Sequence, residues 1–98
     1  MKRVAVEFDP AKSEANVRAR GLPFSLVGDA FDWSSALVAE DRRRDYAERR
    51  FQAIGYLAAR LHVVVFTPIA TGIRVISLRR ANKREVKRYG QEAIPTHI

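Results

Sequence analysis

The chain has 98 residues, of which 47% are hydrophobic and 30% charged, as expected for one small folded domain. It has no cysteine, which excludes disulfides and thiolate metal sites. The formal net charge of +7 favours a polyanionic partner, either nucleic acid or an acidic protein. The sequence contains neither the h-region of a signal peptide nor an apolar run long enough for a membrane span, so we expect a soluble, cytoplasmic protein without membrane contact.

The first predicted elements are a short strand and a helix. Apolar and other residues alternate over 4–8, which is typical of a strand. The segment "DPAKSEANVRARG", residues 9–21, then predicts a helix. Asp9 is a natural N-cap, Pro10 suits the first helical position, and Gly21 can adopt the left-handed conformation that ends a helix.

Two stripes run along this predicted helix. The first consists of small residues and is expected to pack closely against the rest of the protein: Ala11, Ala15 and Ala19. The second, about 100° away, is polar: Lys12, Asn16 and Arg20. We expect the polar stripe to face solvent or a ligand.

A second, shorter helix is predicted over "PFSLVGDAF", residues 23–31, with Ser25 as its cap. Its core side is formed by Phe24, Val27 and Phe31. The segment "DWSS" predicts a turn. A strand is expected over 36–40, followed by a charged loop over 41–48.

The middle of the chain predicts an antiparallel meander. Residues 49–57 alternate, which places Phe51 on one side of a strand and Arg50 on the other. Residues 61–67, "LHVVVFT", form a nearly continuous apolar run, as in a central strand covered on both faces. After a turn, residues 73–79 form the returning strand.

The last predicted element is a short helix. Asn82 opens it, and Glu85 follows at the spacing of a capping box. Tyr89 can lie on its inward side, and Gly90 is expected to end it. Residues 90–98 are expected to form a loose tail.

The order of these elements predicts an α+β fold in a single domain over residues 1–98. Two N-terminal helices come first, a small and mainly antiparallel sheet of about four to five strands follows, and a short C-terminal helix closes the chain. The sequence shows neither repeats nor a linker to a second domain.

The segment "IRVISLRRANKREVKRY", residues 73–89, holds seven Arg or Lys residues and one acid. Regular strand alternation places Arg74 and Arg80 on one side and Ser77 and Arg79 on the other. Charged side chains on a partly buried strand usually have a partner, and guanidinium groups bind phosphate oxygens bidentately. We therefore expect phosphate contacts from these arginines. Other cations of the helix are better explained as a solvated face: Lys83, Lys87 and Arg88.

A second basic segment contains Arg42, Arg43, Arg44, Arg49 and Arg50. The triple arginine is interpreted as a loop that attracts nucleic acid at long range or is simply solvated. Arg50 is the stronger candidate for a site residue, because strand alternation directs its side chain away from Phe51 and over a face of the sheet. An ion pair with Glu48 can orient Arg50, and the same pair can also be its whole role.

Two residues of the closing helix have alternative roles. Glu85 is either the acid of a capping box or a general base for a ribose 2′-hydroxyl, although neighbouring guanidinium groups lower the pKa of a carboxyl and make it a weak base. Tyr89 is either a core aromatic or a group that exchanges a proton or stacks on RNA.

The histidines and carboxylates show no pattern of a metal or cofactor site. His62 begins an apolar strand and His97 lies in the tail, so we do not expect them to act as an acid–base pair. We expect neither a metal nor a cofactor. RNA cleavage would then depend on positioning, with arginines that stabilise charge on the phosphate while the RNA's own 2′-hydroxyl attacks.

Five segments in this order resemble BrnT-type toxins of bacterial type II toxin–antitoxin modules, over about residues 6–89: "EFDPAKSEANVRARG", "PFSLVGDAFDW", "ERRFQAIG", "VVVFT" and "IRVISLRRANKREVKRY". The resemblance implies a RelE-like fold and a metal-independent ribonuclease that halts translation. It also implies a BrnA-type antitoxin that blocks the toxin, carries the DNA-binding part and forms a higher-order hetero-oligomer with it.

The resemblance and the charge pattern together give two sets of site residues. The expected catalytic residues are Arg50, Arg74, Arg79, Glu85 and Tyr89. The expected RNA-binding residues are Lys12, Asn16, Arg20, Ser77, Arg80 and Arg84.

The chain departs from the family pattern at two places. The family commonly has Lys-His-Gly after the first helix, where this chain has Ala19, Arg20 and Gly21, so any catalytic contribution of that Lys or His is missing. Leu78 replaces a usual small residue. The alternative function is therefore a catalytically weak or inactive module that binds RNA or an acidic antitoxin segment through the same basic face.

Overall fold

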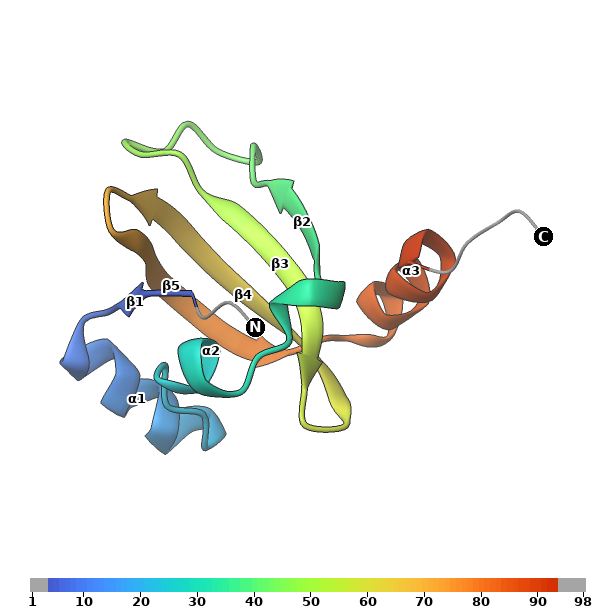
Figure 1. Cartoon of the computed structure of the whole chain (residues 1–98), viewed down its shortest axis with the longest axis horizontal. Helices are drawn as coiled ribbons and strands as arrows, with labels where there is room; N and C mark the ends of the chain where they lie inside the picture. Colours follow the sequence, from blue (N-terminus) through green and yellow to red (C-terminus); the bar gives the residue numbers. More distant parts are fainter. Residues whose placement is uncertain (1–3, 94–98) are drawn as a thin grey trace.

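The computed structural model describes residues 4–93, which form a five-stranded sheet with the strand order β1-β5-β4-β3-β2 and three α-helices (Figure 1). The elements in chain order are β1 Val6–Glu7, α1 Pro10–Arg20, α2 Leu26–Asp29, the 3-10 turn η1 Trp33–Ser35, β2 Leu37–Glu40, β3 Phe51–Leu57, β4 Arg60–Ile69, β5 Gly72–Arg80 and α3 Lys83–Ala93. The strands from β2 to β5 are antiparallel to their neighbours, and β1 is parallel to β5. The predicted α+β class and C-terminal helix are confirmed, whereas the second early helix is only four residues long.

Both predicted ends of α1 are confirmed. The Asp9 side chain accepts a hydrogen bond from the backbone N–H of Ala11 at 2.9 Å, and Pro10 occupies the first turn. Gly21 has a φ of 71° and donates its N–H to the Val17 carbonyl. Only glycine adopts this left-handed conformation without a steric penalty, so the chain can turn sharply back toward the sheet.

The prediction for the faces of α1 is wrong. The stripe expected to pack is exposed: Ala11, Ala15 and Ala19. Instead, Ser13 and Asn16 are buried. The Asn16 amide donates to the carbonyls of Leu22 and Leu78 at 2.8 and 3.0 Å, and the Ser13 hydroxyl accepts from the N–H of Phe24 at 2.9 Å. β1 pairs only with the start of β5, at Ile73 and Arg74. The carbonyl of Leu78, further along the same edge of β5, therefore needs another donor, and Asn16 of α1 supplies it.

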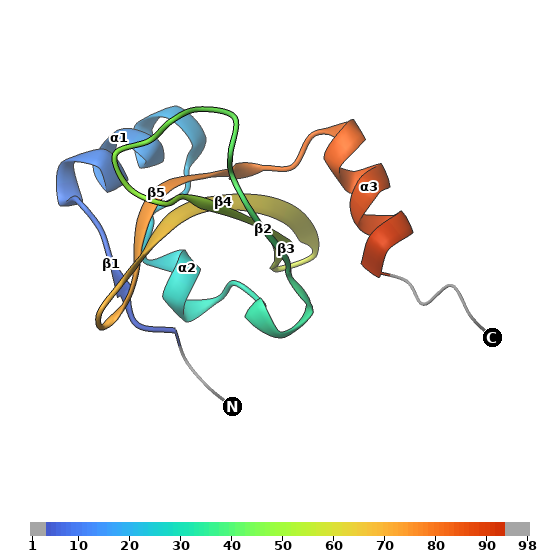
Figure 2. The ribbon, with the colours of Figure 1, turned by 90° about the horizontal axis from the view of Figure 1, so that it is seen from above.

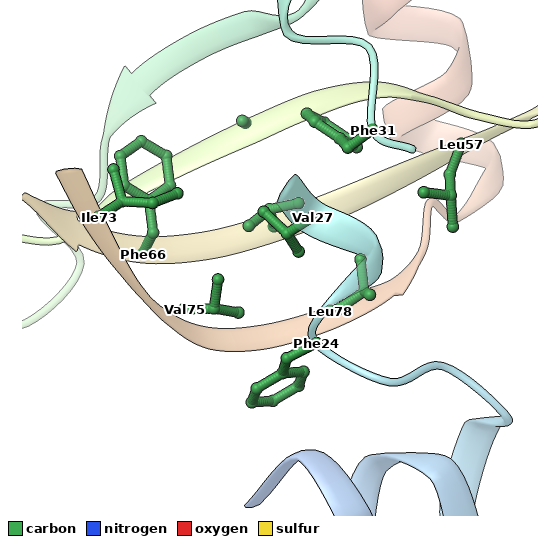
Figure 3. Packing of buried hydrophobic residues seen from close by; sticks show 10 residues of the cluster. Phe24, Val27, Phe31, Leu57, Phe66, Ile73, Val75 and Leu78 are labelled. Atoms are coloured by element: carbon green, nitrogen blue, oxygen red, sulfur yellow. The ribbon is translucent and has the colours of Figure 1, made fainter. Parts of the chain in front are cut away.

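The main core lies between α2 and one face of the sheet (Figure 3). Phe24, Val27 and Phe31 are buried, as predicted. They pack against side chains of three strands: Ala53, Leu57, Val64, Phe66, Ile73, Val75 and Leu78. We call this side the covered face of the sheet.

A smaller cluster on the opposite face joins α3 to the sheet. It consists of Ile54, Val63 and Tyr89, all buried. Since Val63 belongs to this cluster and Val64 to the main core, the centre of β4 is covered on both faces, as predicted.

A β-bulge in β5 corrects the predicted orientation of its polar residues. Val65 of β4 pairs with Ser77 and Phe66 pairs with Val75, so Ile76 has no partner and alternation is interrupted there. The burial pattern agrees, because Ile73, Val75 and Leu78 all join the main core although Leu78 is three residues beyond Val75. The prediction that Arg74 has the same orientation as Arg80 is therefore wrong. Arg74 shares its face with Ser77 and Arg79.

The start of α3 is confirmed and its end is not. The N–H of Asn82 donates to Glu85 at 2.9 Å, and the N–H of Glu85 donates to the Asn82 side chain at 2.8 Å, as in a capping box. The helix continues past Gly90 to Ala93. The residues after Gly90 include good helix formers, which outweigh one glycine. The first part of the expected tail is thus helical, and 94–98 lies outside the described residues.

Viewed from above, α2 lies on one side of the sheet, α1 and the loop between β2 and β3 lie on the other, and α3 stands beyond one end (Figure 2). In the middle of the face opposite α2, Arg74 is exposed and Thr67 is buried. We call this middle part the open face, formed by Gln52, Val65, Thr67, Arg74, Ser77 and Arg79.

Candidate functional site

The open face carries polar and basic side chains in cross-strand rows. The first row is Thr67 and Arg74, and continuing the β3–β4 register by one residue beyond Phe51 places Arg50 opposite Thr67. The second row is Gln52, Val65 and Ser77, and the third is Ile54, Val63 and Arg79. Arg50 and Arg74 are separated by two strand spacings, about 10 Å between backbones, whereas Arg74 and Arg79 lie about 13 Å apart, since their partners are four residues apart on β4. The first row therefore brings two of the predicted arginines together, and Arg79 stands at the other end beside α3.

Arg50 has an unsatisfied nitrogen. Its Nε is the one buried side-chain nitrogen or oxygen of residues 4–93 that lacks a hydrogen-bond partner. The predicted ion pair of Arg50 with Glu48 is confirmed, with 3.9 Å between the Nε and a carboxylate oxygen, although this distance is too long for a hydrogen bond. The Arg50 guanidinium also lies over the ring of Tyr46, 4.4 Å from its centroid. A buried donor without an acceptor is costly, and an anion that reached this nitrogen would satisfy it.

A network in the loop between β2 and β3 holds Tyr46 in place. The Tyr46 hydroxyl donates to the buried Asp41 carboxylate at 3.1 Å, and Arg43 donates to both oxygens of the same carboxylate at 2.9 and 2.8 Å. The hydrogen bonds from Arg43 hold the pKa of Asp41 well below its usual range. The Asp41 N–H also donates to the Arg50 carbonyl at 2.7 Å. The sequence analysis missed this network, although a lone tyrosine among arginines was a usable signal.

The other loop arginines have different environments. Arg49 and Arg42 both donate to Glu40 at 3.0–3.2 Å, and these bonds, that of Arg49 first, lower the pKa of Glu40 to about 2. Arg44 is exposed and makes no ion pair within the described part of the chain. Of the triple arginine, only Arg44 thus matches the expectation of a purely solvated side chain.

Arg74 is paired with a carboxylate that the sequence analysis did not connect to it. Its guanidinium donates to Glu7 at 2.7 and 3.0 Å, because the parallel pairing of β1 with β5 places these residues side by side. Both side chains are about half exposed, at 48% and 55%. Ion pairs of this kind contribute about 0–1 kcal/mol, so a phosphate can replace the carboxylate at little cost.

Arg79 makes a stronger pair with Glu85. Two parallel hydrogen bonds of 2.9 Å join them, and the carboxylate also caps α3. The bonds from Arg79 lower the pKa of Glu85, and those of Glu85 raise the pKa of Arg79 while the charge of Arg43 opposes this rise. A carboxylate that stays ionised and already accepts three hydrogen bonds, two from Arg79 and one from the Asn82 N–H, is a poor proton acceptor. The geometry favours the capping interpretation of Glu85.

Tyr89 is a core residue. Its side chain is buried, its ring packs edge-on against Tyr56 with centroids 5.7 Å apart, and its hydroxyl donates to the Ser35 carbonyl at 2.9 Å. This hydrogen bond satisfies the hydroxyl and holds α3 against the segment before β2. Of the two interpretations of Tyr89, the structure favours the core aromatic.

The expected RNA-binding residues fall into three environments. Arg20 and Arg80 line a hollow of about 360 Å³ with Leu22 and Arg79, and neither Arg20 nor Arg80 makes an ion pair within residues 4–93. Asn16 is buried but accepts a hydrogen bond from Arg20 at 3.0 Å, which orients that guanidinium. Ser77 is half-buried on the open face, and the remaining two are exposed on helices: Lys12 and Arg84.

Replacing Asn16 with alanine is expected to lower the free energy of unfolding by about 2 kcal/mol, because two carbonyls lose their donor. Lys12→Ala on the same helix removes only an exposed side chain and is expected to change it by less than about 0.5 kcal/mol. Urea unfolding of both variants, followed by circular dichroism, measures the difference. Equal stabilities would mean that Asn16 does not hold α1 to β5.

The remaining candidates lie away from the open face. His62 is buried, with Nδ1 3.0 Å from the Arg60 carbonyl, and His97 is outside the described residues. Leu78, which departs from the family pattern, points into the main core, so this departure concerns packing rather than the open face. Residues 4–93 contain no group of three side chains suited to a metal ion. None of their helices combines the length and apolarity that a membrane crossing requires.

Comparison with known families identifies the chain. The model of the ribonuclease toxin BrnT of type II toxin–antitoxin systems matches residues 8–85, which include Arg50, Arg74 and Arg79 but not Tyr89. A comparison with curated proteins gives no match. The family match spans most of the chain and all strands except β1. The protein therefore belongs to the BrnT family, the ribonuclease toxins of type II toxin–antitoxin systems.

Proposed function

We propose that the chain is a metal-independent endoribonuclease that inhibits translation, binds RNA on the open face and is neutralised by a BrnA-type antitoxin. Membership of the BrnT family supports the ribonuclease class and an antitoxin partner. The observation that carries the rest is the unsatisfied Nε of Arg50, at the same end of the sheet as Arg74. The mixed sheet with its closing helix is compatible with the RelE-like fold, which stays a prediction.

In this proposal the scissile phosphate lies between Arg50 and Arg74. Arg50 donates its free Nε, and Arg74 exchanges the exposed carboxylate of Glu7 for a phosphate oxygen. The 2′-hydroxyl of the RNA gives its proton to water and attacks the phosphorus, the bond to the 5′-oxygen of the next nucleotide breaks, and that oxygen takes a proton from water, which leaves a 2′,3′-cyclic phosphate. The guanidinium groups stabilise the added negative charge. Ser77, in the neighbouring row, can donate a further hydrogen bond.

The other predicted residues are given supporting roles. Arg79, Glu85 and Tyr89 fix α3 to the sheet rather than exchange protons. The hollow with Arg20 and Arg80 binds a neighbouring phosphate of the RNA. Since guanidinium groups stay charged at every relevant pH, this arrangement acts by positioning and electrostatics.

The purified chain should cleave single-stranded RNA in the presence of excess EDTA and leave 2′,3′-cyclic phosphate ends. Substituting a 2′-deoxynucleotide at the mapped cleavage position should abolish the cut there. Cleavage that appears only when a divalent metal is added would contradict metal independence. RNA that stays intact under all conditions would contradict the proposed enzyme.

A second candidate function is a module that binds RNA without cleaving it. Two observations favour it: Ala19 and Arg20 replace the usual Lys-His, and the open face carries no imidazole. In that case RNA affinity should fall steeply with salt, because the binding would rest on phosphate contacts.

Tyr46→Leu is expected to lower kcat by about tenfold without a comparable change in KM, because the guanidinium of Arg50 loses its supporting ring. Tyr46→Phe keeps the ring and is expected to retain most of the activity. Steady-state cleavage of a short fluorescent RNA measures both variants. A Tyr46→Phe variant as slow as Tyr46→Leu would show that the ring's contact with Arg50 is not what matters.

A further inference from the structure

A groove lies between the β3–β4 hairpin and α3, at the end of the sheet away from Arg50. Its floor and walls are apolar, from Tyr56, Leu61, Ala81 and Val86, and its volume is about 300 Å³. Tyr56 and Val86 are two of the four large hydrophobic residues exposed within residues 4–93, at 40% and 46%. Two such residues on facing walls of one groove form a continuous apolar surface rather than scattered exposure.

The helix that forms one wall is sparsely packed. Among the described side chains of α3, Tyr89 alone is buried. Figure 1 shows α3 standing off the side of the sheet. A helix of 11 residues is marginal in water without tertiary packing, so α3 depends on Tyr89 and on the pair of Arg79 with Glu85. A partner that fills the groove would complete the packing of this helix.

The rim of the groove is basic. Five cations surround it or lie on the exposed side of α3: Arg60, Arg80, Lys83, Arg84 and Lys87. None of them makes an ion pair within the described part of the chain. Apart from Tyr56, the apolar lining is aliphatic, from Leu61, Ala81 and Val86. Aliphatic side chains suit those of a protein better than nucleotides, which bind to stacking aromatics and phosphate contacts. An apolar groove with a basic rim is complementary to a segment that alternates apolar and acidic residues.

We propose that the groove docks an acidic, amphipathic segment of the module's antitoxin. Its apolar side chains pack against Tyr56 and Val86, and its carboxylates pair with Arg60 and Arg80. Because Arg80 also lines the hollow with Arg20, the bound segment competes with RNA for that cation. The inference rests on the proposed neutralisation by an antitoxin and adds where that protein binds.

The test uses two substitutions in the groove and two matched controls. Val86→Lys and Arg60→Glu alter the wall and the rim, whereas Val38→Lys and Arg18→Glu alter an exposed valine on β2 and an exposed arginine on α1. Titration calorimetry with the purified antitoxin is expected to give a Kd at least about tenfold weaker for each groove variant and unchanged for each control. Thermal unfolding of all four variants checks that they are folded.

Cleavage of RNA by the same variants separates this inference from the proposed function. The groove variants should cut RNA as the unaltered chain does, and in cells they should stay toxic when the antitoxin is co-expressed. Unchanged antitoxin affinity in both groove variants, or equal losses in the controls, would overturn the docking site. Loss of RNA affinity with full antitoxin affinity would assign the groove to RNA and overturn it as well. If the unaltered chain never cuts RNA, the enzyme proposal fails while the antitoxin Kd values still decide on the groove.

Discussion

Arg50→Ala is expected to lower kcat/KM for RNA cleavage by about 10²-fold, the usual effect of removing one preorganised donor to a developing negative charge. The Nε of Arg50 is buried without a partner, its guanidinium rests on Tyr46, and its backbone carbonyl accepts from the Asp41 N–H. A phosphate that reaches this Nε, once the side chains that cover it move aside, meets a donor with no hydrogen bond to break. Single-turnover cleavage of an RNA of defined length measures the effect.

Two further variants test whether the geometry of the guanidinium matters. Arg50→Lys keeps the charge but not the planar fork, and it is expected to recover only part of the lost activity. Arg44→Ala, in the same loop, removes an exposed arginine that makes no ion pair within residues 4–93 and is expected to change kcat/KM by less than about twofold. If Arg44→Ala and Arg50→Ala lower activity equally, the loop acts through general charge, and Arg50 has no special position.

Deletion of Ile76 is expected to leave the chain folded, with a loss of about 1 kcal/mol from its half-buried side chain. Ile76 is the unpaired residue of the bulge, so its removal restores regular alternation in β5. Val75 and Ser77 then become neighbours, as their partners Phe66 and Val65 are, and Arg74 keeps its face. Circular dichroism and thermal unfolding of the purified variant measure the loss.

Deletion of Arg44 is the matched control, because it also shortens the chain by one residue but in an exposed loop between β2 and β3. Loops tolerate such changes, and its melting temperature is expected to fall by only a few degrees. A variant without Ile76 that fails to fold would contradict this pairing, because it would show that the bulge itself is needed to place Arg74 on its face.

The sequence correctly predicted the helix ends that are stabilised by neighbouring residues. Asp9 and Gly21 define the ends of α1, and Asn82 with Glu85 starts α3, because caps depend on neighbouring backbone groups. In each case the sequence signal and the stabilising contact lie within a few residues of each other.

Other features depend on contacts that the sequence does not place next to each other. Glu7 meets Arg74 only because β1 pairs in parallel with β5, and α1 docks through Asn16 because distant carbonyls need a donor. The three-residue spacing between the apolar residues Val75 and Leu78 was a local signal of the bulge at Ile76. The prediction overlooked this signal because it assumed regular alternation along the whole strand. The candidate site was therefore predicted in its residue types and only partly in its geometry.

Chemical-shift mapping of the chain with a non-cleavable 2′-O-methyl RNA tests most directly whether the open face binds the substrate. We expect the largest changes at the Nε–H signal of Arg50 and at the backbone amides of Gln52 and Ser77, with little change in α2 on the covered face. Large shifts centred on α2, with the Nε–H of Arg50 unmoved, would contradict the account.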